Sequence, residues 1–536
     1  RTMALKNLPL SVQTFLKMRT DNYIYVDKTE YVHKIASVKG VYFLSRPRRF
    51  GKSLFISTLK ELFESNRLLF NDLWIADKWD WSQKNPVIHI SFASLDYQNL
   101  GLPAAITEHL EEIASTNGIQ LTKKSFKGQF IELIKQLYHQ AGQVVILIDE
   151  YDKPIIDYLE QSGLKQARTN QKTLKTFYSV LKDAEPYLRL VFITGVSKFS
   201  KVSIFSDLNH LTDITLDIAY ANITGYSQSE LEFYFDDYLK ELMKFHNLGR
   251  DALLALMKFW YNGFSWDGIH TLYNPYGTLN FLKQKDFRNF WFSTGTPTFL
   301  FSIMKKHTRF TFENALSSGT LLDKYDLDNL DLTALLFQTG YLTIQKRNFT
   351  TGEIVLDYPN QEVRDSMYAY LINNLAPSFT TKPAEITVQD LQQAFRAHDL
   401  ERVEDIVNTL FSDVPYNLFE KQVRKDNADL DKFMDAALLA ENFFHGLIHL
   451  MFKYLGVFID SEVHTAKGRA DSVVQTDTHI YIFEFKFNKT AEEAFQQIED
   501  RGYARKYKLS GKTIIGIGVN FNRKERLTDA WIIKNL

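Results

Sequence analysis

The 536 residues are too many for a single hydrophobic core, so we expect two to four domains. The 45% hydrophobic and 24% charged residues are typical of a globular protein, and a net charge of −1 excludes a global basic field for nucleic acid. The absence of cysteine excludes disulfides, thiolate metal sites and a cysteine nucleophile. The sequence has no apolar run of membrane-spanning length and no signal peptide, so we expect a cytoplasmic protein without membrane contacts.

Residues 43–55, FLSRPRRFGKSLF, end like a phosphate-binding loop. The final G-K-S of the pattern G-x-x-x-x-G-K-[ST] is present, but Arg46 stands at the first glycine. A buried-strand pattern at 40–45 precedes the loop and a helical pattern at 52–64 follows it. Backbone N–H groups at a helix N-terminus hold phosphates in this setting. We therefore predict a nucleotide site formed by Arg46, Pro47, Arg48, Arg49, Phe50, Gly51, Lys52, Ser53 and Leu54.

A second stretch, QVVILIDEYDKPI at 143–155, reads as a central parallel strand that ends in two carboxylates. Asp149 at such a strand end can hold Mg²⁺ through water, and Glu150 can take a proton from an attacking water. The alternative is a strand followed by an acidic turn. The strand pattern at 188–200 ends in polar Thr194 and Ser197, where a sensor of the γ-phosphate would lie.

Further strand patterns at 86–92 and 211–217 complete an alternation of strands and helices. This alternation predicts a doubly wound parallel sheet that binds a nucleotide at the carboxyl ends of its strands. A second G-K-T, at 511–513, leads into a strand pattern rather than a helix, so we interpret it as a turn.

These stretches resemble the bacterial and archaeal predicted AAA-ATPase-like family nearly end to end. The resemblance is carried by YIYVDKTEYV, FLSRPRRFGKSLF, VVILIDEYDKPI and FITGVSKFS, and continues through YNGFSW, YNPYGTLNFL and STGTPTFL. It implies an AAA-like P-loop NTPase in which R-P-R-R-F-G-K-S is the usual loop. It further implies Lys52 on the β- and γ-phosphates, Ser53 and Asp149 on Mg²⁺, and Glu150 as the base.

The roles of the arginines stay open in the sequence. Pro47 pre-sets one φ angle of the loop. Arg48 or Arg49 would then add charge near the phosphates, face a partner, or form a solvated basic loop tip. Arg189 and Arg288 are candidates for an arginine finger, but the sequence alone does not assign one.

The middle of the chain predicts a helical lid over 226–375, with a helix at 229–245 and a hairpin at 337–367. A proline-containing boundary at 376–389 leads into a helical stretch that reaches about residue 430. We expect four segments: an ATPase core at 1–225, the lid and hairpin at 226–375, a helical linker at 376–430 and a C-terminal α/β domain at 431–536.

The C-terminal segment predicts a helix at 436–456, then the strand THIYIFEFKFN at 478–488 with apolar residues on both faces. Glu484 and Lys486 share one face of this buried strand, which is costly unless they are paired or bind a metal. Asp471, at the head of the preceding strand, would lie beside Glu484 in a hairpin. Two carboxylates and a lysine would then form a site for Mg²⁺ or Mn²⁺. The alternative is an edge strand with a solvated Glu–Lys pair.

This region resembles the PD-(D/E)XK nuclease superfamily, which implies a restriction-endonuclease-like fold. Asp471 matches the first motif Asp, although Ala470 replaces the usual proline, and Glu484 with Lys486 matches E-x-K. Glu441 matches the acidic residue of the first helix as a metal ligand, and Gln497 the glutamine of an exonuclease-type helix motif. Tyr503 lies six residues after Gln497 rather than four. Nucleic-acid contacts are predicted at Gln497, Arg501, Arg505, Lys506 and Lys508, with a solvated helix face as the competing interpretation.

Together these patterns predict an ATPase fused to a metal-dependent nuclease, with ATP and Mg²⁺ or Mn²⁺ as cofactors. The expected partner is nucleic acid, DNA in the first instance, with homo-oligomerisation possible. An alternative is an ATP-gated switch whose C-terminal domain binds nucleic acid or protein without cutting. A P-loop kinase is a third reading, disfavoured by Asp149–Glu150 and by the lack of a small-substrate signature.

Overall fold

The computed structural model divides into two compact units. Unit 1 comprises Arg1–Phe299 and Phe312–Val363, and unit 2 comprises Leu300–Thr311 and Arg364–Leu536. The predicted boundaries at 225, 375 and 430 are finer than this division and stay predictions. The residues that the structure describes are 5–160, 162–198, 204–208, 210–292, 298–307, 311–323, 327, 330–375, 383–412, 444–456, 460–463, 471–522, 524–525 and 527–536.

Unit 1 is built around a five-stranded sheet in the order β2-β3-β4-β1-β5 in which every pairing is parallel. This confirms the predicted α/β class with its parallel sheet. The strands are β1 (Val41–Ser45), β2 (Val87–Ser91), β3 (Val144–Asp149), β4 (Leu188–Gly195) and β5 (Leu211–Asp213). The last two are shorter than the patterns at 188–200 and 211–217 predicted. Every residue of β1 and β3 is buried, as expected for central strands covered on both faces.

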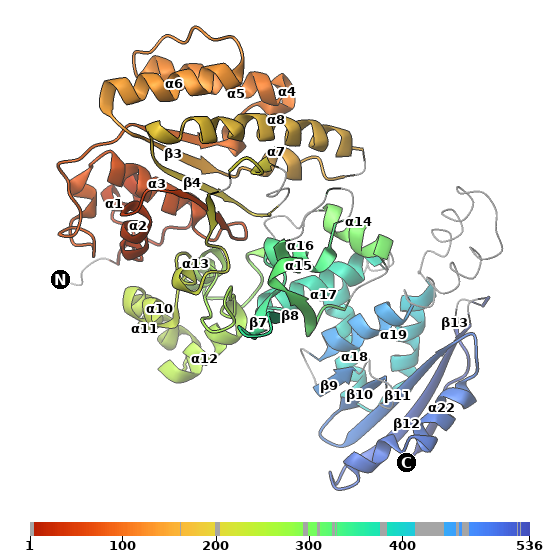
Figure 1. Cartoon of the computed structure of the whole chain (residues 1–536). Helices are drawn as coiled ribbons and strands as arrows, with labels where there is room; N and C mark the ends of the chain where they lie inside the picture. The colour runs from red at the N-terminus through yellow and green to blue at the C-terminus, as the bar shows by residue number, and fades with distance from the viewer. Residues whose placement is uncertain are drawn as a thin grey trace, which may run out of the picture. The chain divides into compact units, whose positions relative to one another are not determined.

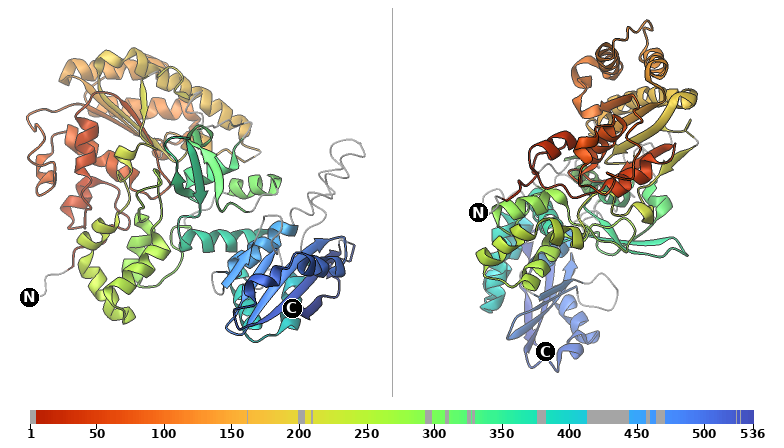
Figure 2. Two further views of the ribbon diagram at one scale, coloured as in Figure 1. Left: turned by 60° about the horizontal axis from the view of Figure 1, so that its bottom comes forward. Right: turned by 90° about the vertical axis from the view of Figure 1, so that its left-hand side faces the viewer.

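Helices cover both faces of this sheet, as Figure 1 shows, and the two views in Figure 2 separate the orange and gold helices from the red ones. One layer contains α1 (Phe15–Thr20), α2 (Thr29–Ala36) and α3 (Lys52–Phe63). The other contains α5 (Leu102–Thr116), α6 (Phe126–Ala141) and α8 (Leu164–Asp183), with the short helices α4 (Tyr97–Leu100) and α7 (Lys153–Ile156) between the longer elements. In α3, Phe55, Ile56, Leu59, Leu62 and Phe63 are buried at helical spacing, which explains why the segment is helical and which face packs on the sheet.

The carboxyl ends of the strands meet at one edge because the strands are parallel. Ser45 of β1 pairs with Gly195 of β4, and Asp149 of β3 pairs with Ser91 of β2. The loops that follow β1, β3 and β4 therefore lie side by side, and they contain the predicted nucleotide-site residues.

The segment that follows the sheet is helical, as predicted, and has its own apolar core. Its helices are α10 (Gln228–Tyr234), α11 (Asp236–His246), α12 (Arg250–Tyr261) and α13 (Pro275–Gln284). The helical pattern predicted at 229–245 is confirmed, but it forms two helices, because the backbone of Phe235, at φ −114° and ψ 18°, is not helical. The side chain of Asn274 caps α13 by accepting a hydrogen bond from the Gly277 N–H at 3.0 Å.

A three-stranded sheet in the order β6-β8-β7 follows, with two helices between its first and second strands in sequence. Its elements are β6 (Ala315–Ser318), α15 (Gly319–Asp323), α16 (Leu332–Thr339), β7 (Thr343–Arg347) and β8 (Glu353–Asp357). The predicted hairpin is confirmed as β7 and β8, but its ends belong to α16 and to α17 (Gln361–Leu375) instead of strands. Gly340 ends α16 at φ +91°, and a Cβ there would lie 2.7 Å from the Pro47 Cγ atom, so glycine permits the close approach to the phosphate loop.

Unit 2 contains a six-stranded sheet with the path β13-β12-β11-β10-β9, and β14 pairs with β12. Its elements are α14 (Thr298–His307), α18 (Ala384–Arg396), α19 (Leu400–Ser412), a helix at 444–455, β9 (Asp460–Val463), β10 (Ser472–Gln475), β11 (His479–Phe487), α22 (Ala491–Asp500), β12 (Thr513–Asn522), β13 (Leu527–Thr528) and β14 (Ile532–Asn535). The start of the helix predicted at 436–456, and of the linker beyond 412, lies outside the described residues. The second G-K-T forms a turn before β12, as predicted, with Gly511 at φ +73°.

β11 is a central strand, with antiparallel β10 on one side and parallel β12 on the other. The edge-strand alternative is therefore wrong. Among the described residues, no helix combines the length and apolarity that crossing a membrane requires.

A buried carboxylate in unit 1 ties the end of the helical segment to the phosphate loop. Glu362 accepts hydrogen bonds from the backbone N–H groups of Phe290 at 2.7 Å and Trp291 at 2.6 Å. The Trp291 indole N–H in turn donates to the Arg48 carbonyl at 3.0 Å. The glutamate thus fixes the tryptophan that holds the loop from outside.

Burial raises the pKa of Glu362 to about 7, against an ordinary value of 4.5. Between these values the folded chain binds more protons than the unfolded chain, so this group's contribution to stability falls as pH rises through that window. The quantity to compare is the melting temperature of Glu362→Gln minus that of the parent. We expect this difference to be more positive at pH 8 than at pH 5. Glu353→Gln, at an exposed position of β8, is the matched control. A difference that is the same at both pH values would contradict this assignment.

Candidate functional site

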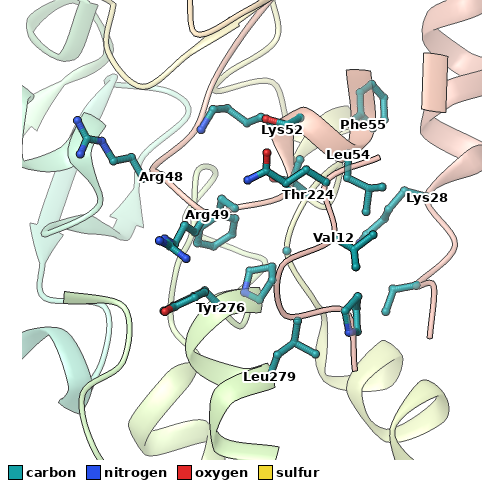
Figure 3. Close-up of a pocket in the computed structure, with 18 of the residues that line it drawn as sticks. Val12, Lys28, Arg48, Arg49, Lys52, Leu54, Phe55, Thr224, Tyr276 and Leu279 are labelled. Carbon is teal, nitrogen blue, oxygen red and sulfur yellow. The ribbon is translucent and has the colours of Figure 1, made fainter. Parts of the chain in front are cut away.

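A cavity of about 590 Å³ lies against the phosphate loop in unit 1 (Figure 3). Four stretches enclose it: the N-terminal segment 9–13, loop and helix residues 48–55, the segment 223–226 and the start of α13. Glu150, Asp152 and Lys153, which follow β3, complete the wall. The volume is in the range of small-molecule sites.

The loop closes with Gly51 at φ +86°, and α3 begins at the next residue. Lys52 is the first residue of that helix and is buried, with its ammonium donating to the carbonyls of Arg46 at 3.0 Å and Pro47 at 2.8 Å. Burial lowers the pKa of Lys52, and the nearby Asp149 and Glu150 oppose that shift. The ammonium thus lies within its own loop, at the helix N-terminus that borders the cavity.

Ser53 and Asp149 are in direct contact, as the Ser53 hydroxyl donates to the Asp149 carboxylate at 2.5 Å. The second oxygen of that carboxylate accepts from the Glu150 N–H at 3.0 Å and lies 3.5 Å from the Thr194 hydroxyl. Groups from the start of α3, from the residue after β3 and from the end of β4 therefore converge on one carboxylate. A serine hydroxyl beside an aspartate is a donor set that suits Mg²⁺.

Glu150 sits in the left-handed region at φ +51°, next to the cavity. Its Oε2 atom is buried without a hydrogen-bond partner among the described residues. Burial, then the charge of Asp149, raises the pKa of Glu150. A strained residue with an unsatisfied carboxylate oxygen facing a cavity is suited to accept a proton there.

Asp152 is a residue of this site that the sequence analysis missed. It is buried and accepts from the Ser197 N–H at 2.7 Å, the Ser197 hydroxyl at 2.6 Å and the Val196 N–H at 3.2 Å. Burial raises its pKa, and the Ser197 hydrogen bonds oppose that shift. Ser197 is therefore held by Asp152 in the turn after β4. The signal was present in the sequence as the second aspartate of D-E-Y-D.

Arg46 lies in the core and does not line the cavity. Its guanidinium donates to the carbonyls of Ser45 at 2.9 Å, Thr215 at 3.0 Å and Tyr220 at 3.4 Å. It also stacks on the Trp266 ring, 4.1 Å from the centroid. Burial lowers its pKa, although an arginine stays charged under such conditions. The residue at the first-glycine position therefore has both terminal nitrogens engaged by protein carbonyls, while its Nε atom is buried without a hydrogen-bond partner among the described residues.

The other loop residues face different surroundings. Arg48 is exposed at the cavity rim, while Arg49, at φ +59°, lies over the Tyr276 ring at 4.2 Å (Figure 3). Phe50 is buried, with its ring centroid 5.1 Å from those of Phe264 and Trp266. Leu54 lines the cavity, whereas Pro47, Thr194 and Ser197 do not.

Neither arginine-finger candidate lies at the cavity. Arg189 is at the start of β4, at the opposite edge of the sheet, and donates to the Ala36 carbonyl at 2.6 Å. Arg288 is exposed, 3.7 Å from the carboxylate of Asp286.

The second constellation lies in unit 2, on β10 and β11. The hairpin register pairs Ser472 with Phe483, which puts Asp471 opposite Glu484. The Asp471 carboxylate accepts from the Phe485 N–H at 2.9 Å. Glu484 is 2% exposed, and its Oε2 atom has no hydrogen-bond partner among the described residues. Burial, then the charge of Asp471, raises the pKa of Glu484 to about 7.

Lys486, Gln497 and Tyr503 extend this network. The Lys486 ammonium donates to Glu484 at 3.1 Å and to the Gln497 side-chain oxygen at 2.6 Å. The Gln497 amide N–H group donates to Glu484 and lies 3.4 Å from the Tyr503 hydroxyl. Tyr503 reaches Gln497 across six residues because α22 ends at Asp500 and Gly502, at φ +61°, turns the chain back into a short 3₁₀ helix.

The predicted basic residues lie on that same turn. Arg501, Arg505, Lys506 and Lys508 are exposed along the segment that contributes Tyr503. Glu441 lies outside the described residues. Among the residues that are described, no three His, Asp or Glu side chains form a metal-binding cluster, so this site offers two carboxylates. That number fits Mg²⁺, which usually keeps several waters and takes one or two carboxylates.

Comparison with known proteins agrees with both constellations. A family model described as predicted AAA-ATPase matches residues 9–205, and one described as PD-(D/E)XK nuclease superfamily matches residues 439–531. A protein of Azotobacter chroococcum mcd 1, described as uncharacterized and located in the vnfD 5′ region, is 36% identical over 547 residues, covering all of both chains. The chain belongs to this predicted AAA-ATPase family and carries a PD-(D/E)XK nuclease-superfamily domain. Both resemblances identified in the sequence are thus confirmed.

Two solved structures are more distantly similar. One is the Aeropyrum pernix ORC1 protein in complex with DNA, at 10% identity and a TM-score of 0.25, covering 67% of this chain and 97% of that chain. The other is a signal transduction ATPase with numerous domains from Pyrococcus horikoshii, at 12% identity and a TM-score of 0.25, covering 82% of this chain and 59% of that chain. Likenesses of this size support no conclusion about the present chain.

The contacts of the buried Arg46 guanidinium predict that this residue stabilises the ATPase-like unit against unfolding. Arg46→Ala would remove the guanidinium donors of the Ser45 and Thr215 carbonyls, each at a cost of about 1–3 kcal/mol, whereas the Tyr220 carbonyl would still accept from the Ile223 N–H. We expect the free energy of unfolding of unit 1 to fall by roughly 3 kcal/mol or more. Urea unfolding followed by tryptophan fluorescence would measure it, because Trp266 is stacked on the guanidinium. Arg48→Ala, at an exposed neighbour, is expected to change it by less than about 0.5 kcal/mol, and equal effects would refute the anchor role.

Proposed function

We propose that the protein binds and hydrolyses ATP and cleaves nucleic-acid phosphodiester bonds at a Mg²⁺- or Mn²⁺-dependent site under ATP control. The observation that carries the proposal is the pairing of half-buried Asp471 with buried Glu484, which lies beside Lys486 on a central strand. Two adjacent carboxylates, one of them buried, repel each other, so a bound cation would offset the electrostatic cost of this pair.

For the ATP half, each side chain has a role that its contacts support. Lys52 would release its loop carbonyls and donate to the β- and γ-phosphates, with Ser53 and Asp149 as the ligands of Mg²⁺. Glu150 would take the proton of the attacking water. Thr194 and Ser197 would report the γ-phosphate through their contacts with Asp149 and Asp152.

For the nuclease half, a bound divalent cation supplies Lewis-acid stabilisation of the extra negative charge that develops on the phosphate. Asp471 and Glu484 would hold that ion, with the Phe485 carbonyl as a further oxygen and Glu441, the acidic residue of the first helix, as a further candidate ligand. Lys486 would orient the water, and Gln497 would fix the lysine at 2.6 Å. Arg501, Arg505, Lys506 and Lys508 would contact the phosphate backbone, DNA being the expected substrate.

Control by ATP is supported by the contact between the phosphate loop and α13, which both line the cavity. Arg49 of the loop stacks on Tyr276 of α13, so the helical segment and the phosphate loop meet at the nucleotide site. A nucleotide there would alter that contact and with it the arrangement of 226–375. The division into a core, a lid region, a linker and a nuclease domain at 225, 375 and 430 belongs to the same proposal, as does assembly into a homo-oligomer.

The ATP site is tested by two substitutions with opposite expectations. Lys52→Ala should abolish ATP binding, because it removes the charge that meets the phosphates. Glu150→Gln should retain binding and lose hydrolysis, because the amide keeps the shape and cannot accept the proton. Equilibrium binding of a fluorescent ATP analogue and phosphate release would be measured on both proteins. ATP binding by Lys52→Ala at the parent's affinity would rule the loop out as a phosphate site.

The nuclease site is tested in the full chain with labelled DNA and RNA in Mg²⁺ or Mn²⁺. Asp471→Ala and Glu484→Ala should each eliminate cutting and weaken Mn²⁺ binding. Lys486→Ala should reduce cutting strongly while leaving Mn²⁺ binding largely intact, because an ammonium is not a ligand. Lys524→Ala, at an exposed lysine of the same unit, is the matched control.

These variants also separate the two candidate functions. Cutting that depends on the metal and is lost in Asp471→Ala supports the nuclease. Nucleic acid or protein bound without cutting under every metal and nucleotide condition would instead support an ATP-gated binding module, and would overturn the proposed cleavage.

A further inference from the structure

A row of positive charge lies along α8, in the ATPase-like unit. From Leu164 to Lys182 this helix contains five basic residues and no Asp or Glu. They are Lys165, Arg168, Lys172, Lys175 and Lys182. The whole chain has a net charge of −1, so this helix departs sharply from the rest of the sequence. None of these residues belongs to the sites described above.

The five basic residues share one face of the helix. At 100° per residue they fall within an arc of about 100°, and they extend over about 26 Å of helix axis. All five are exposed. The opposite face, with Ala167, Leu174, Phe177, Tyr178 and Leu181, is buried against the domain, and Figure 1 shows α8 on the outer side of the sheet.

The lysines of this face make no ion pair with the described part of the chain. Carboxylates usually neutralise such exposed rows through i to i+4 pairs. The one carboxylate of α8, Asp183 at its end, lies neither three nor four residues from any of the five basic residues. Hydroxyl groups flank the row, with Thr169 and Thr176 exposed beside it. Each already donates to the carbonyl four residues earlier, at 3.0 and 3.2 Å, which leaves the oxygen as an acceptor.

We propose that this basic face of α8 binds the sugar–phosphate backbone of nucleic acid. The charge row is long enough to meet several successive phosphates, which lie about 3.4 Å apart along the axis of each strand. An anionic membrane is a poorer fit, because a helix that lies on a membrane inserts apolar side chains, and those of α8 are committed to the core. The proposal rests on the proposed function in that the bound strand is the substrate class of the nuclease site.

The position of α8 gives the contact a use. The helix joins β3, which ends in Asp149, to β4, which leads to Ser197. Its Asn170 amide donates to the Pro154 carbonyl at 2.7 Å, in the segment that follows Glu150. Nucleic acid on α8 would therefore contact the ATPase-like unit directly, separately from Arg501, Arg505 and Lys506 in unit 2.

The test compares two triple variants of the full chain with the same change in net charge. Lys165→Gln, Lys172→Gln and Lys175→Gln removes part of the α8 face. Glutamine has nearly the helix propensity of lysine, so the helix should be retained. The control triple is Lys244→Gln, Lys258→Gln and Lys283→Gln, at exposed positions of α11, α12 and α13.

Binding of labelled duplex DNA, single-stranded DNA and RNA would be measured by fluorescence anisotropy in EDTA across a salt series, so that cleavage plays no part. The α8 triple should bind about ten- to a hundredfold more weakly at 100 mM salt, with the slope of log K against log salt less steep by about 3. The control triple should match the parent. Circular dichroism of both triples verifies that the helices are intact, and Arg168→Gln with Lys182→Gln provides a second, independent reduction of the same face.

Binding to phosphatidylserine vesicles would be measured in parallel. Three outcomes would overturn the proposal: equal affinity and salt slope in the two triples, no nucleic-acid binding by the parent, or an α8 triple that loses binding to the vesicles but not to nucleic acid. Its failure is distinguishable from failure of the nuclease. If the triples bind alike while Asp471→Ala still abolishes cutting, the α8 surface is refuted and the nuclease stands. If the α8 triple loses binding while the parent never cuts, the surface stands and the nuclease is refuted.

Discussion

The burial of the Arg46 guanidinium is the constraint on which the nucleotide site depends. Burying a cation is costly unless polar groups compensate it. The two terminal nitrogens of Arg46 donate to carbonyls at the end of β1 and in the segment after β5, and the guanidinium stacks on the ring of Trp266. These partners come from three separate stretches of unit 1. The start of the phosphate loop is therefore fixed from within the core, and the first glycine of the usual pattern can be replaced.

From that fixed point the rest of the loop is free to face the cavity. Pro47 packs against Gly340, and the Trp291 indole holds the Arg48 carbonyl, so the loop is also supported from outside. Lys52 begins α3 behind it. The loop is thus fixed at its start by the buried Arg46 and further along by the Trp291 contact. Such support on both sides suits a site that must hold a charged ligand in a defined geometry.

Both candidate sites follow the same electrostatic logic. In each, a strand leads to a glutamate whose Oε2 atom is buried and has no hydrogen-bond partner among the described residues: half-buried Glu150 after β3 and buried Glu484 within β11. In each, a neighbouring aspartate raises the pKa of the glutamate further, and a lysine opposes that shift. A buried carboxylate oxygen without a partner destabilises the fold, and a bound cation or proton would offset that cost. This is why such groups are typical of functional sites.

The sequence by itself determined the parallel sheet, the families and the chemical groups at both sites, because strands, G-K-S and E-x-K are local patterns whose periodicity survives in any context. The tertiary structure alone decided which arginine is buried, that Asp152 holds Ser197, and that Tyr503 reaches Gln497 across six residues. These contacts join residues from different strands, or residues on either side of a turn at Gly502. No local pattern encodes such distances, since they depend on how separate elements pack.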